Sequence, residues 1–462
     1  MTLVVKSKIM KLKIQTYINN HNLANSGTTL LVACSGGVDS MVLVDVLLKL
    51  HYKIAIAHCN FQLRGNESDE DEKFIQQFAS QYSLPFHAIK FDTKAYKQQH
   101  DVSTQMAART LRYEWFEKIR KENGYHSIAT AHHLDDQLET IILNIAKGTG
   151  IKGLTGMQAK NGFVIRPLLE ISKQEILRYA MENNIAFRED SSNASDDYQR
   201  NLIRHQVVPQ LQKINPSLHT SLIDFIDRMN DYETLTNQQI ESIKKKCYSE
   251  KNGIAEIKLG FIKTQKAGQT ILFHLLKEFG FNSDNVVQLF QSLKTLEKLY
   301  CGKQFYSETH RIVIDRKSLF VVPKNIEREN YLSLDKIPNQ IVFNNYKIQC
   351  TLVPIQELNI KSSNRYAYFD ADKMEFPLLV RYYKEGDYFY PFGMSKPKTP
   401  GKAGKKKLSK YFKDEKFSLL DKENTAVLFS GEKLIWLIGH RIDDRFKVQE
   451  GTQKILKMVI TG

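Results

Sequence analysis

The sequence has no paired cysteines and no long apolar run. Its five cysteines lie far apart, with no C-x-x-C pair. They do not form a disulfide framework, so a reducing compartment fits best. No run of about 18 apolar residues occurs, and lysines interrupt the N-terminal segment where a secretory signal would be apolar. We therefore expect a cytoplasmic protein with no membrane association.

Internal repeats are also absent, and acidic residues are in the minority. The chain carries 66 Lys and Arg against 51 Asp and Glu, a formal net charge of +15. Such an excess favours a polyanionic partner, because basic side chains that neutralise phosphates release bound counterions. Charge spread over the surface for solubility is the alternative. With 462 residues, 42% of them hydrophobic, we expect two to four globular domains.

Short apolar runs alternate with helical patterns in the first part of the chain. The expected strands are 28–34, 53–58, 85–91 and 126–130, and the expected helices are 41–50, 67–82, 103–121 and 134–146. This alternation predicts an α/β domain with a doubly wound parallel sheet covered on both faces. Ligands of such sheets bind at the carboxyl ends of the strands.

The character of the chain changes after about residue 150. A last strand leading into a helix is expected at 165–176, helices at about 215–299, a hairpin at 311–322, and a β-rich region from about residue 366. We predict three domains. They are an α/β domain at 1–210, a mainly helical middle domain at 211–355, and a small β-rich α+β domain at 356–462.

The turn after the first expected strand is Ser35-Gly36-Gly37-Val38-Asp39-Ser40, here called the 35–40 loop. Its glycines allow a ligand close to the backbone, and its N–H groups with the next helix N-terminus form an anion nest. It lacks the spacing and the lysine of a Walker A loop and does not match G-x-G-x-x-G. Asp39 beside phosphates implies an intervening Mg²⁺. The plainer alternative is an ordinary glycine-rich turn with a capping serine.

The 35–40 loop resembles the PP-loop of the ATP pyrophosphatase superfamily, whose members adenylate a substrate and release pyrophosphate. The superfamily includes synthetases of GMP, NAD and argininosuccinate, tRNA thiolases and tRNA(Ile)-lysidine synthetases. The loop alone does not choose among them.

Later segments resemble the tRNA(Ile)-lysidine synthetases specifically. They occur in the family's order at 58–64, 106–109, 111–113, 131–140, 166–169, 189–193 and 200–205. The likeness is dense over about 30–210, thin from 215 to 360, and returns near the C-terminus. The family usually has a second histidine where this chain has Phe61, to which we assign no role.

Charged pairs within these segments are spaced to share a helix face. Arg109 and Arg112 are three residues apart, as are Asp136 and Glu139. Acids near an ATP site suit a lysine ammonium or Mg²⁺ better than phosphates. The resemblance implies that Arg112, Asp136 and Glu139 hold the amino-acid substrate. The alternative is that these charges form a salt bridge between helices. For Arg109, stabilisation of its helix and a functional role fit the sequence equally well.

His132 and Arg204 are further candidates for substrate contact. His132 and Asp136 are four apart, but a third ligand for catalytic zinc is not evident nearby. We therefore expect His132 to contact nucleotide or base. Arg204 ends a polar, basic segment, and the resemblance favours a place at the active-site rim over a solvated helix.

Lysines and aromatic residues are interleaved near the C-terminus. The stretch 396–416 contains nine lysines and two acids, and 380–394 is rich in tyrosine and phenylalanine. Rings that stack on bases and ammonium groups that meet phosphates suit RNA. A lysine-rich loop without a partner is the alternative. Both this region and the middle domain are expected to bind tRNA, the former at the acceptor arm.

The resemblance implies a two-step reaction. ATP held by the 35–40 loop adenylates the C2 oxygen of the wobble cytidine of tRNA(Ile) with a CAU anticodon and releases pyrophosphate. Free L-lysine then attacks C2 and displaces AMP, forming lysidine. The group that takes the proton is left open among Asp39, Asp136 and Glu139, and a homodimer is also left open.

Other functions fit the sequence less well. A PP-loop tRNA thiolase would normally need paired cysteines, and an amidating synthetase would need a glutaminase. A tRNA-binding module with a decayed ATP site would not need an intact 35–40 loop and acidic cluster.

Overall fold

The computed structural model describes residues 3–461 except 26, 64, 189–198, 295–302, 326–328, 358–362, 394 and 397–398. The chain divides into two compact units, Met1–Asn237 and Gln238–Gly462. In the described residues, no helix is both long and apolar enough to cross a membrane.

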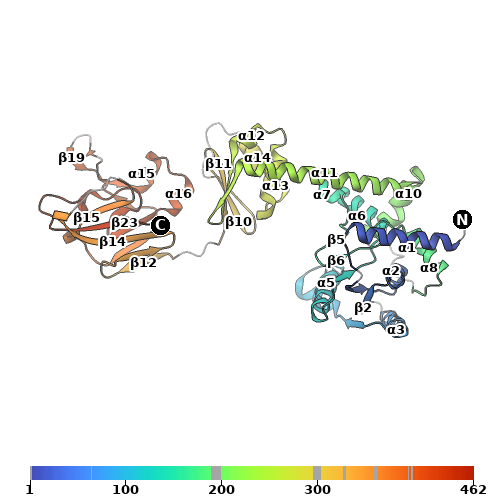
Figure 1. Ribbon diagram of the computed structural model, residues 1–462. Helices are drawn as coiled ribbons and strands as arrows, with labels where there is room; N and C mark the ends of the chain where they lie inside the picture. Colours follow the sequence, from blue (N-terminus) through green and yellow to red (C-terminus); the bar gives the residue numbers. More distant parts are fainter. Residues whose placement is uncertain are drawn as a thin grey trace. The chain divides into compact units, whose positions relative to one another are not determined.

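The first unit is built on a mainly parallel sheet (Figure 1). The strand order is β3-β2-β1-β4-β6-β5, with only β5 antiparallel to its neighbour. The strands are β1 (Thr29–Ala33), β2 (Lys53–Asn60), β3 (Phe86–Lys90), β4 (Ser127–Ala129), β5 (Lys160–Asn161) and β6 (Val164–Ile165). The order reverses between β1 and β4, which makes the carboxyl ends of these two strands the expected ligand site.

Helices cover both faces of this sheet. They are α1 (Leu3–Asn20), α2 (Val38–Lys49), α3 (Asn66–Gln81), α4 (Thr93–His100), α5 (Thr104–Glu122), α6 (Leu134–Ala146), α7 (Ile151–Leu154) and α8 (Lys173–Glu182). Alternation along β1 explains the two layers: Leu30 and Val32 pack against α1, α2, α3 and α8, whereas Leu31 packs against α5. The predicted doubly wound fold is confirmed.

A helical segment follows the sheet. It comprises α9 (Gln199–Leu202), a π-helical turn (Ile203–Val207), α10 (Val208–Ile214) and α11 (Leu218–Cys247), which ends in the second unit. Ile203 and Val208 pack with Leu138 of α6 and Leu222 of α11 in one buried cluster. This packing fixes the π-helical turn against α6, beside the sheet's carboxyl edge.

The second unit begins with an α/β layer. An antiparallel sheet of order β7-β8-β11-β10-β9 packs against helices and the end of α11. The strands are β7 (Tyr248–Lys251), β8 (Ile254–Lys258), β9 (Gln304–Tyr306), β10 (His310–Ile314) and β11 (Ser318–Pro323), and the helices are α12 (Leu259–Thr264), α13 (Gly268–Leu276) and α14 (Ser283–Lys294). The hairpin expected at 311–322 is β10–β11. Strands β7 and β8 lie where only helices were expected.

The remainder of the second unit contains two facing antiparallel sheets around one core. Their orders are β12-β16-β21-β22 and β13-β14-β23-β15. The strands are β12 (Tyr331–Leu334), β13 (Gln340–Phe343), β14 (Tyr346–Pro354), β15 (Tyr366–Asp370), β16 (Leu378–Tyr382), β21 (Ala426–Ser430), β22 (Lys433–Leu437) and β23 (Lys454–Ile460). The predicted β-rich C-terminal region is confirmed.

Short elements connect β16 to β21. They are β17 (Tyr388–Phe389), β18 (Ser395–Lys396), β19 (Thr399–Ala403), β20 (Lys406–Lys407), α15 (Leu408–Asp414) and α16 (Leu419–Asn424). Phe389, Leu408 and Phe412 form a small core with Leu437 of β22. An ion pair from Arg311 of β10 to Glu423 of α16 joins the two parts of the second unit.

Candidate active site

The 35–40 loop turns the chain from β1 into α2 at the reversal point of the sheet. Gly36 has φ +86°, a backbone conformation that side-chain-bearing residues rarely adopt, and a Cβ there would lie 3.4 Å from Ile75. Val38 begins α2 and is buried. The sequence therefore places a helix N-terminus at the point where parallel sheets bind ligands.

The two serines of the loop hold its shape from inside. The Ser35 N–H donates to the Ser40 hydroxyl at 3.2 Å, and that hydroxyl donates to the Gly37 carbonyl at 2.9 Å. Ser40 is buried, so its hydroxyl is occupied within the loop. Ser35 is the more accessible hydroxyl for a ligand.

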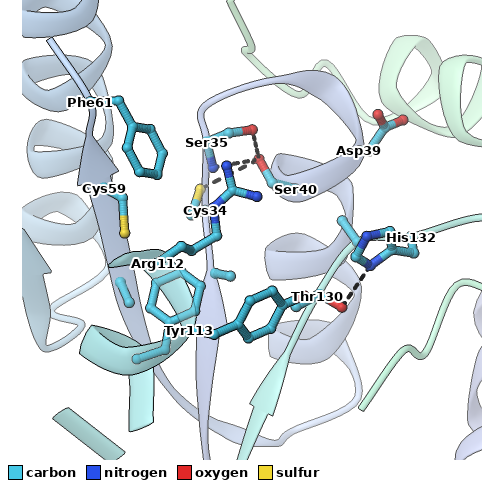
Figure 2. Close-up of a pocket in the computed structure, with 14 residues that line it drawn as sticks. Cys34, Ser35, Asp39, Ser40, Cys59, Phe61, Arg112, Tyr113, Thr130 and His132 are labelled. Carbon is cyan, nitrogen blue, oxygen red and sulfur yellow. Dashed lines mark hydrogen bonds between the residues drawn. The ribbon is translucent and has the colours of Figure 1, made fainter. Parts of the chain in front are cut away.

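A cavity of about 240 Å³ opens in front of the loop (Figure 2). Its lining includes Ser35, Asp39, Ser40, Cys59, Phe61, Arg112, Tyr113 and His132. The walls come from the loop, the end of β2, helix α5 and the segment after β4. Polar groups from distant parts of the chain thus converge on one partly apolar cavity, which is the usual form of a small-molecule site.

Two of the predicted residues, Arg112 and His132, line this cavity. The Arg112 guanidinium lies 5.1 Å from the centre of the Phe61 ring, a cation–π contact. His132 Nδ1 lies 3.0 Å from the Thr130 hydroxyl. Burial lowers the pKa of His132 to about 4, so its ring is neutral near pH 7 and can both donate and accept a hydrogen bond.

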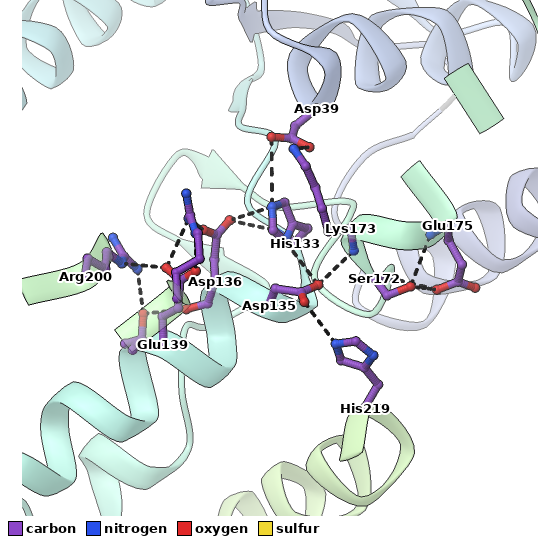
Figure 3. Close-up of polar contacts among 12 residues, drawn as sticks. Asp39, His133, Asp135, Asp136, Glu139, Ser172, Lys173, Glu175, Arg200 and His219 are labelled. Atoms are coloured by element: carbon purple, nitrogen blue, oxygen red, sulfur yellow. Dashed lines mark hydrogen bonds and ion pairs between the residues drawn. The ribbon is translucent and has the colours of Figure 1, made fainter. Parts of the chain in front are cut away.

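Asp39 is paired with a lysine that the sequence analysis did not identify. Lys173 Nζ at the start of α8 lies 2.6 Å from Asp39 Oδ1. Asp135 accepts the Lys173 backbone N–H at 2.8 Å and contacts His219 at 3.0 Å (Figure 3). Lys173 offsets part of the negative charge of Asp39, and it brings to the loop the lysine that a Walker A motif carries in its own sequence.

His133 connects the 35–40 loop to the acidic cluster. Its Nε2 lies 3.9 Å from Asp39 Oδ2 and 3.6 Å from Asp136 Oδ2. Its backbone N–H donates to Asp136 at 3.0 Å, which caps α6. Burial raises the pKa of Asp136, but His133 and His132 outweigh burial, so the pKa lies below its usual value and the carboxylate is ionised.

Glu139 is held by two arginines from the segment after the sheet. Arg204 in the π-helical turn makes a bidentate contact with it, at 2.6 and 3.1 Å, and Arg200 lies 3.4 Å away. Arg204 also reaches Asp136 Oδ1 at 3.5 Å. Burial raises the pKa of Glu139 against the opposing effect of Arg204. The carboxylate of Glu139 is thus already engaged, whereas that of Asp136 is less fully occupied.

The predicted residues therefore form two adjoining groups. The 35–40 loop, Arg112 and His132 line the cavity, while Asp136, Glu139 and Arg204 form the ion-pair network beside it. Arg109 is exposed and its guanidinium lies over the Tyr113 ring at 5.0 Å. The 189–193 motif lies outside the described residues.

Sequence reasoning missed Lys173 and His133 as members of the site. Lys173 stands inside the expected strand-to-helix segment at 165–176, and its pattern S-K-Q-E is that of a helix start. Its proximity to Asp39 depends on the strand order, which the sequence does not give. Among the described residues, three or more side chains able to hold a metal ion do not gather at any point.

Three family models match the chain in succession. A PP-loop domain matches residues 6–211, a TilS substrate binding domain matches 249–324, and a TilS substrate C-terminal domain matches 378–459. With the fold and the 35–40 loop, these matches define the class: an ATP-binding enzyme with a PP-loop α/β domain and further substrate-binding domains.

Curated relatives identify the family within this class. A tRNA(Ile)-lysidine synthase of Parabacteroides distasonis is 40% identical over 452 residues, covering 97% of this chain and 99% of the relative. One of Bacteroides thetaiotaomicron is 39% identical over 444 residues, covering 96% and 98%. The chain belongs to the tRNA(Ile)-lysidine synthase family. Among solved structures, the U34-tRNA thiolase NcsA of Methanococcus maripaludis covers 49% of this chain and 80% of its own, at 18% identity and a TM-score of 0.42.

Proposed function

We propose that the chain ligates free L-lysine to C2 of the wobble cytidine of tRNA(Ile) bearing a CAU anticodon, releasing AMP and pyrophosphate. The observation that carries this proposal is the adjacency of two kinds of site. An anion nest for ATP phosphates lies at the sheet's reversal point, and His133 links it directly to a carboxylate cluster suited to an ammonium group.

The first step uses the 35–40 loop. The cytidine C2 oxygen attacks the α-phosphorus of ATP, and pyrophosphate leaves toward the loop N–H groups and Lys173. Donors fixed before the reaction stabilise the charge that develops on the leaving group. The ion pair of Lys173 with Asp39 supports this role, because it holds the ammonium at the loop before ATP arrives.

Mg²⁺ fits this arrangement through Asp39. Mg²⁺ in nucleotide sites commonly takes one or two carboxylates, with phosphates and water completing its shell. The Asp39 side chain is partly exposed at the cavity and offers such an oxygen, and its second oxygen contacts Lys173. When bound there, Mg²⁺ would neutralise phosphate charge beside Asp39.

The second step needs a site for lysine. We assign the substrate ammonium to Asp136, which is ionised. Its Oδ2 accepts the His133 backbone N–H at 3.0 Å, whereas its Oδ1 has only the longer contact with Arg204, at 3.5 Å. Glu139 is saturated by Arg204 and Arg200, so its part is to position Arg204. Arg112 is suited to the substrate carboxylate, since guanidinium and carboxylate pair bidentately. The lysine amine then attacks C2, loses a proton, and AMP departs.

The cytidine itself fits the partly apolar cavity. A base must leave the anticodon stack to react, and enclosed aromatic and apolar walls compensate for the stacking it loses. Phe61 and Tyr113 provide such walls, and the neutral ring of His132 can hydrogen-bond the base edge. We accordingly give Phe61 a role in lining the base pocket.

We further propose a division of labour along the chain. Residues 1–210 carry catalysis, and 211–355 and 356–462 bind tRNA. The lysine-rich segment of the last part supports this, because counterion release makes such clusters bind RNA irrespective of sequence. A cytoplasmic location and a homodimer remain predictions.

Separating the two steps tests these assignments. With ATP and tRNA(Ile) but no lysine, the wild-type chain should form adenylated tRNA and pyrophosphate. Asp136→Asn should still form this intermediate but need far more lysine to release AMP, whereas Asp39→Ala should form none. If Asp39→Ala modified tRNA at the wild-type rate, the role of the loop would be wrong; if Asp136→Asn left the lysine requirement unchanged, the lysine site would be wrong.

A further inference from the structure

A second cavity, of about 460 Å³, lies in the β-rich part of the second unit. Aromatic and polar side chains share its walls, and we call it the aromatic pocket. Tyr366, Tyr368, Phe392, Tyr411 and Phe417 supply the rings, and His440 and Arg441 supply polar groups. None of these residues takes part in the reaction described above.

The rings face the pocket because of strand alternation and a fixed turn. Along β15, Ala367 and Phe369 enter the core, so Tyr366 and Tyr368 project from the opposite face with near-parallel rings, 7° apart and 6.3 Å between centres. Phe392 lies in the turn after β17, and its backbone N–H donates to the Ile442 carbonyl at 3.1 Å. Its side chain is 46% exposed. An aromatic surface is thus presented on an ordered frame.

The polar groups of the pocket are held for hydrogen bonding. Arg441 Nη1 donates to the Phe392 carbonyl at 3.1 Å, and the Arg441 side chain also hydrogen-bonds that of Tyr411, so its guanidinium is held at the pocket wall. The His440 ring packs 4.7 Å from that of Phe417, and burial lowers the pKa of His440, so the imidazole is neutral near pH 7. Glu415 adds a carboxylate. The pocket therefore offers both donors and acceptors beside its rings.

Cations accompany these rings. Lys447 lies 5.7 Å from the centre of the Phe392 ring, and Arg441 is itself part of the pocket wall. Helix α15 contributes Tyr411 to the pocket and carries Lys410 and Lys413. Aromatic faces for stacking, flanked by cations for phosphates, form the pattern that binds single-stranded nucleic acid.

We propose that the aromatic pocket receives an unpaired base from the single-stranded 3′ end of the tRNA substrate. The proposal rests on the proposed function, which makes tRNA the partner. Moving a base into a pocket costs the least free energy when that base is already outside a helix. The 3′ end of a tRNA is unpaired and has a free terminus. Base pairs of the acceptor helix cannot enter, since their faces are covered by stacking.

A double-mutant cycle between protein and RNA tests this proposal. The full chain, as wild type and as Phe392→Ala or Tyr366→Ala, is titrated at one fixed salt concentration with intact tRNA(Ile) and with tRNA(Ile) lacking its unpaired 3′ nucleotides. Each pocket variant, and the truncation alone, should weaken binding by about 5- to 100-fold, as loss of one base–ring stack does. Truncated tRNA should bind each pocket variant as tightly as it binds the wild-type chain, because the truncation has already removed the contact between base and ring.

Controls separate the pocket from general effects. Tyr366→Phe keeps the ring and should retain wild-type affinity. Tyr331→Ala removes a ring that is 65% exposed in the same unit but outside the pocket, and should change neither tRNA's affinity. Phe392→Ala removes an exposed ring and leaves the core intact.

Two results would overturn the proposal. Pocket variants that bind intact tRNA as tightly as wild type would show that the pocket takes no base. If the affinity lost in a pocket variant and the affinity lost on truncation of the tRNA added up fully when combined, the 3′ end would not occupy the pocket. The proposed function is tested separately, because lysine incorporation at saturating tRNA should persist in every pocket variant and would be missing from the wild type if that function were wrong.

Discussion

The buried carboxylate of Glu139 gives a sharp prediction about how the active site is held. Glu139→Gln keeps the shape of the side chain but removes the charge that faces Arg204 and Arg200. Removing one partner of a fully buried ion pair costs about 3–5 kcal/mol, and exposed pairs contribute about 0.2–1 kcal/mol. The Glu139 side chain is 1% exposed and that of Arg204 is 37% exposed. We expect a loss of about 2 kcal/mol, since water partly compensates Arg204.

A matched control lies on the same unit. Glu117 and Arg120 of α5 make a bidentate pair of similar geometry, at 2.7 and 2.9 Å, with side chains 29% and 12% exposed. Glu117 is open to water, and without its charge Arg120 still donates to the Tyr125 carbonyl at 3.1 Å and lies 3.6 Å from the centre of the Phe163 ring. Glu117→Gln should therefore cost at most about 1 kcal/mol. For a unit of this size, about 2–4 °C per kcal/mol then predicts a fall of about 4–8 °C for Glu139→Gln and less than about 4 °C for the control.

Thermal unfolding followed by tryptophan fluorescence measures both variants. Trp115 lies in the first unit and Trp436 in the second, so a Trp436→Phe background makes Trp115 the sole reporter of the first unit. Adding Arg204→Met to Glu139→Gln should recover part of the loss, because the unpaired charge is removed. Equal shifts for Glu139→Gln and Glu117→Gln, or a further loss in the double variant, would refute the reasoning.

Three further predictions concern the catalytic cavity. Lys173→Met should lower kcat/KM for ATP by at least about 100-fold, the effect of removing one preorganised charge contact, and unchanged kinetics would contradict its role at the phosphates. Arg112→Ala should raise the KM for lysine about 10- to 100-fold as a charged pair is lost, whereas exposed Arg109→Ala should leave it within about threefold; equal effects would oppose the assignment. Burial lowers the pKa of His132 to about 4, below about 6.5 in the unfolded chain. The folded state is therefore not destabilised by His132 above pH 6.5, and it loses up to about 3 kcal/mol of stability as the pH falls to 4, because the unfolded chain takes up the proton first. Urea unfolding of His132→Asn should show a shallower fall in stability between about pH 6.5 and 4. A pH profile identical to that of the wild type would exclude His132 as the source of the fall.

The fold of the first unit was largely readable from the sequence. Helix α6 was expected at 134–146 and occupies Leu134–Ala146, because its apolar residues, such as Leu134, Leu138 and Ile141, recur at helical spacing. Helix α1 and strands β12–β14 were not foreseen. Strands with mixed polar and apolar residues, such as Tyr346–Pro354, derive their stability from pairing with distant strands, here β23.

The site residues were predictable only where their functional groups lie together in one short segment of the sequence. The 35–40 loop carries its function in its own glycines and hydroxyls. Lys173 reaches Asp39 from 134 residues away, a contact set by strand order that local patterns do not encode. The sequence likewise suggested that Asp136 and Glu139 act alike, whereas Arg204 engages Glu139 far more closely.

The most direct test of the central claim is incorporation of labelled lysine. The chain is incubated with ATP, radiolabelled L-lysine and tRNA(Ile) bearing a CAU anticodon, with elongator tRNA(Met) of the same anticodon in parallel. The account predicts ATP-dependent label in tRNA(Ile), one lysine and one AMP per tRNA, and little in tRNA(Met). Label that stays out of the RNA, or that enters both tRNAs equally, would contradict it.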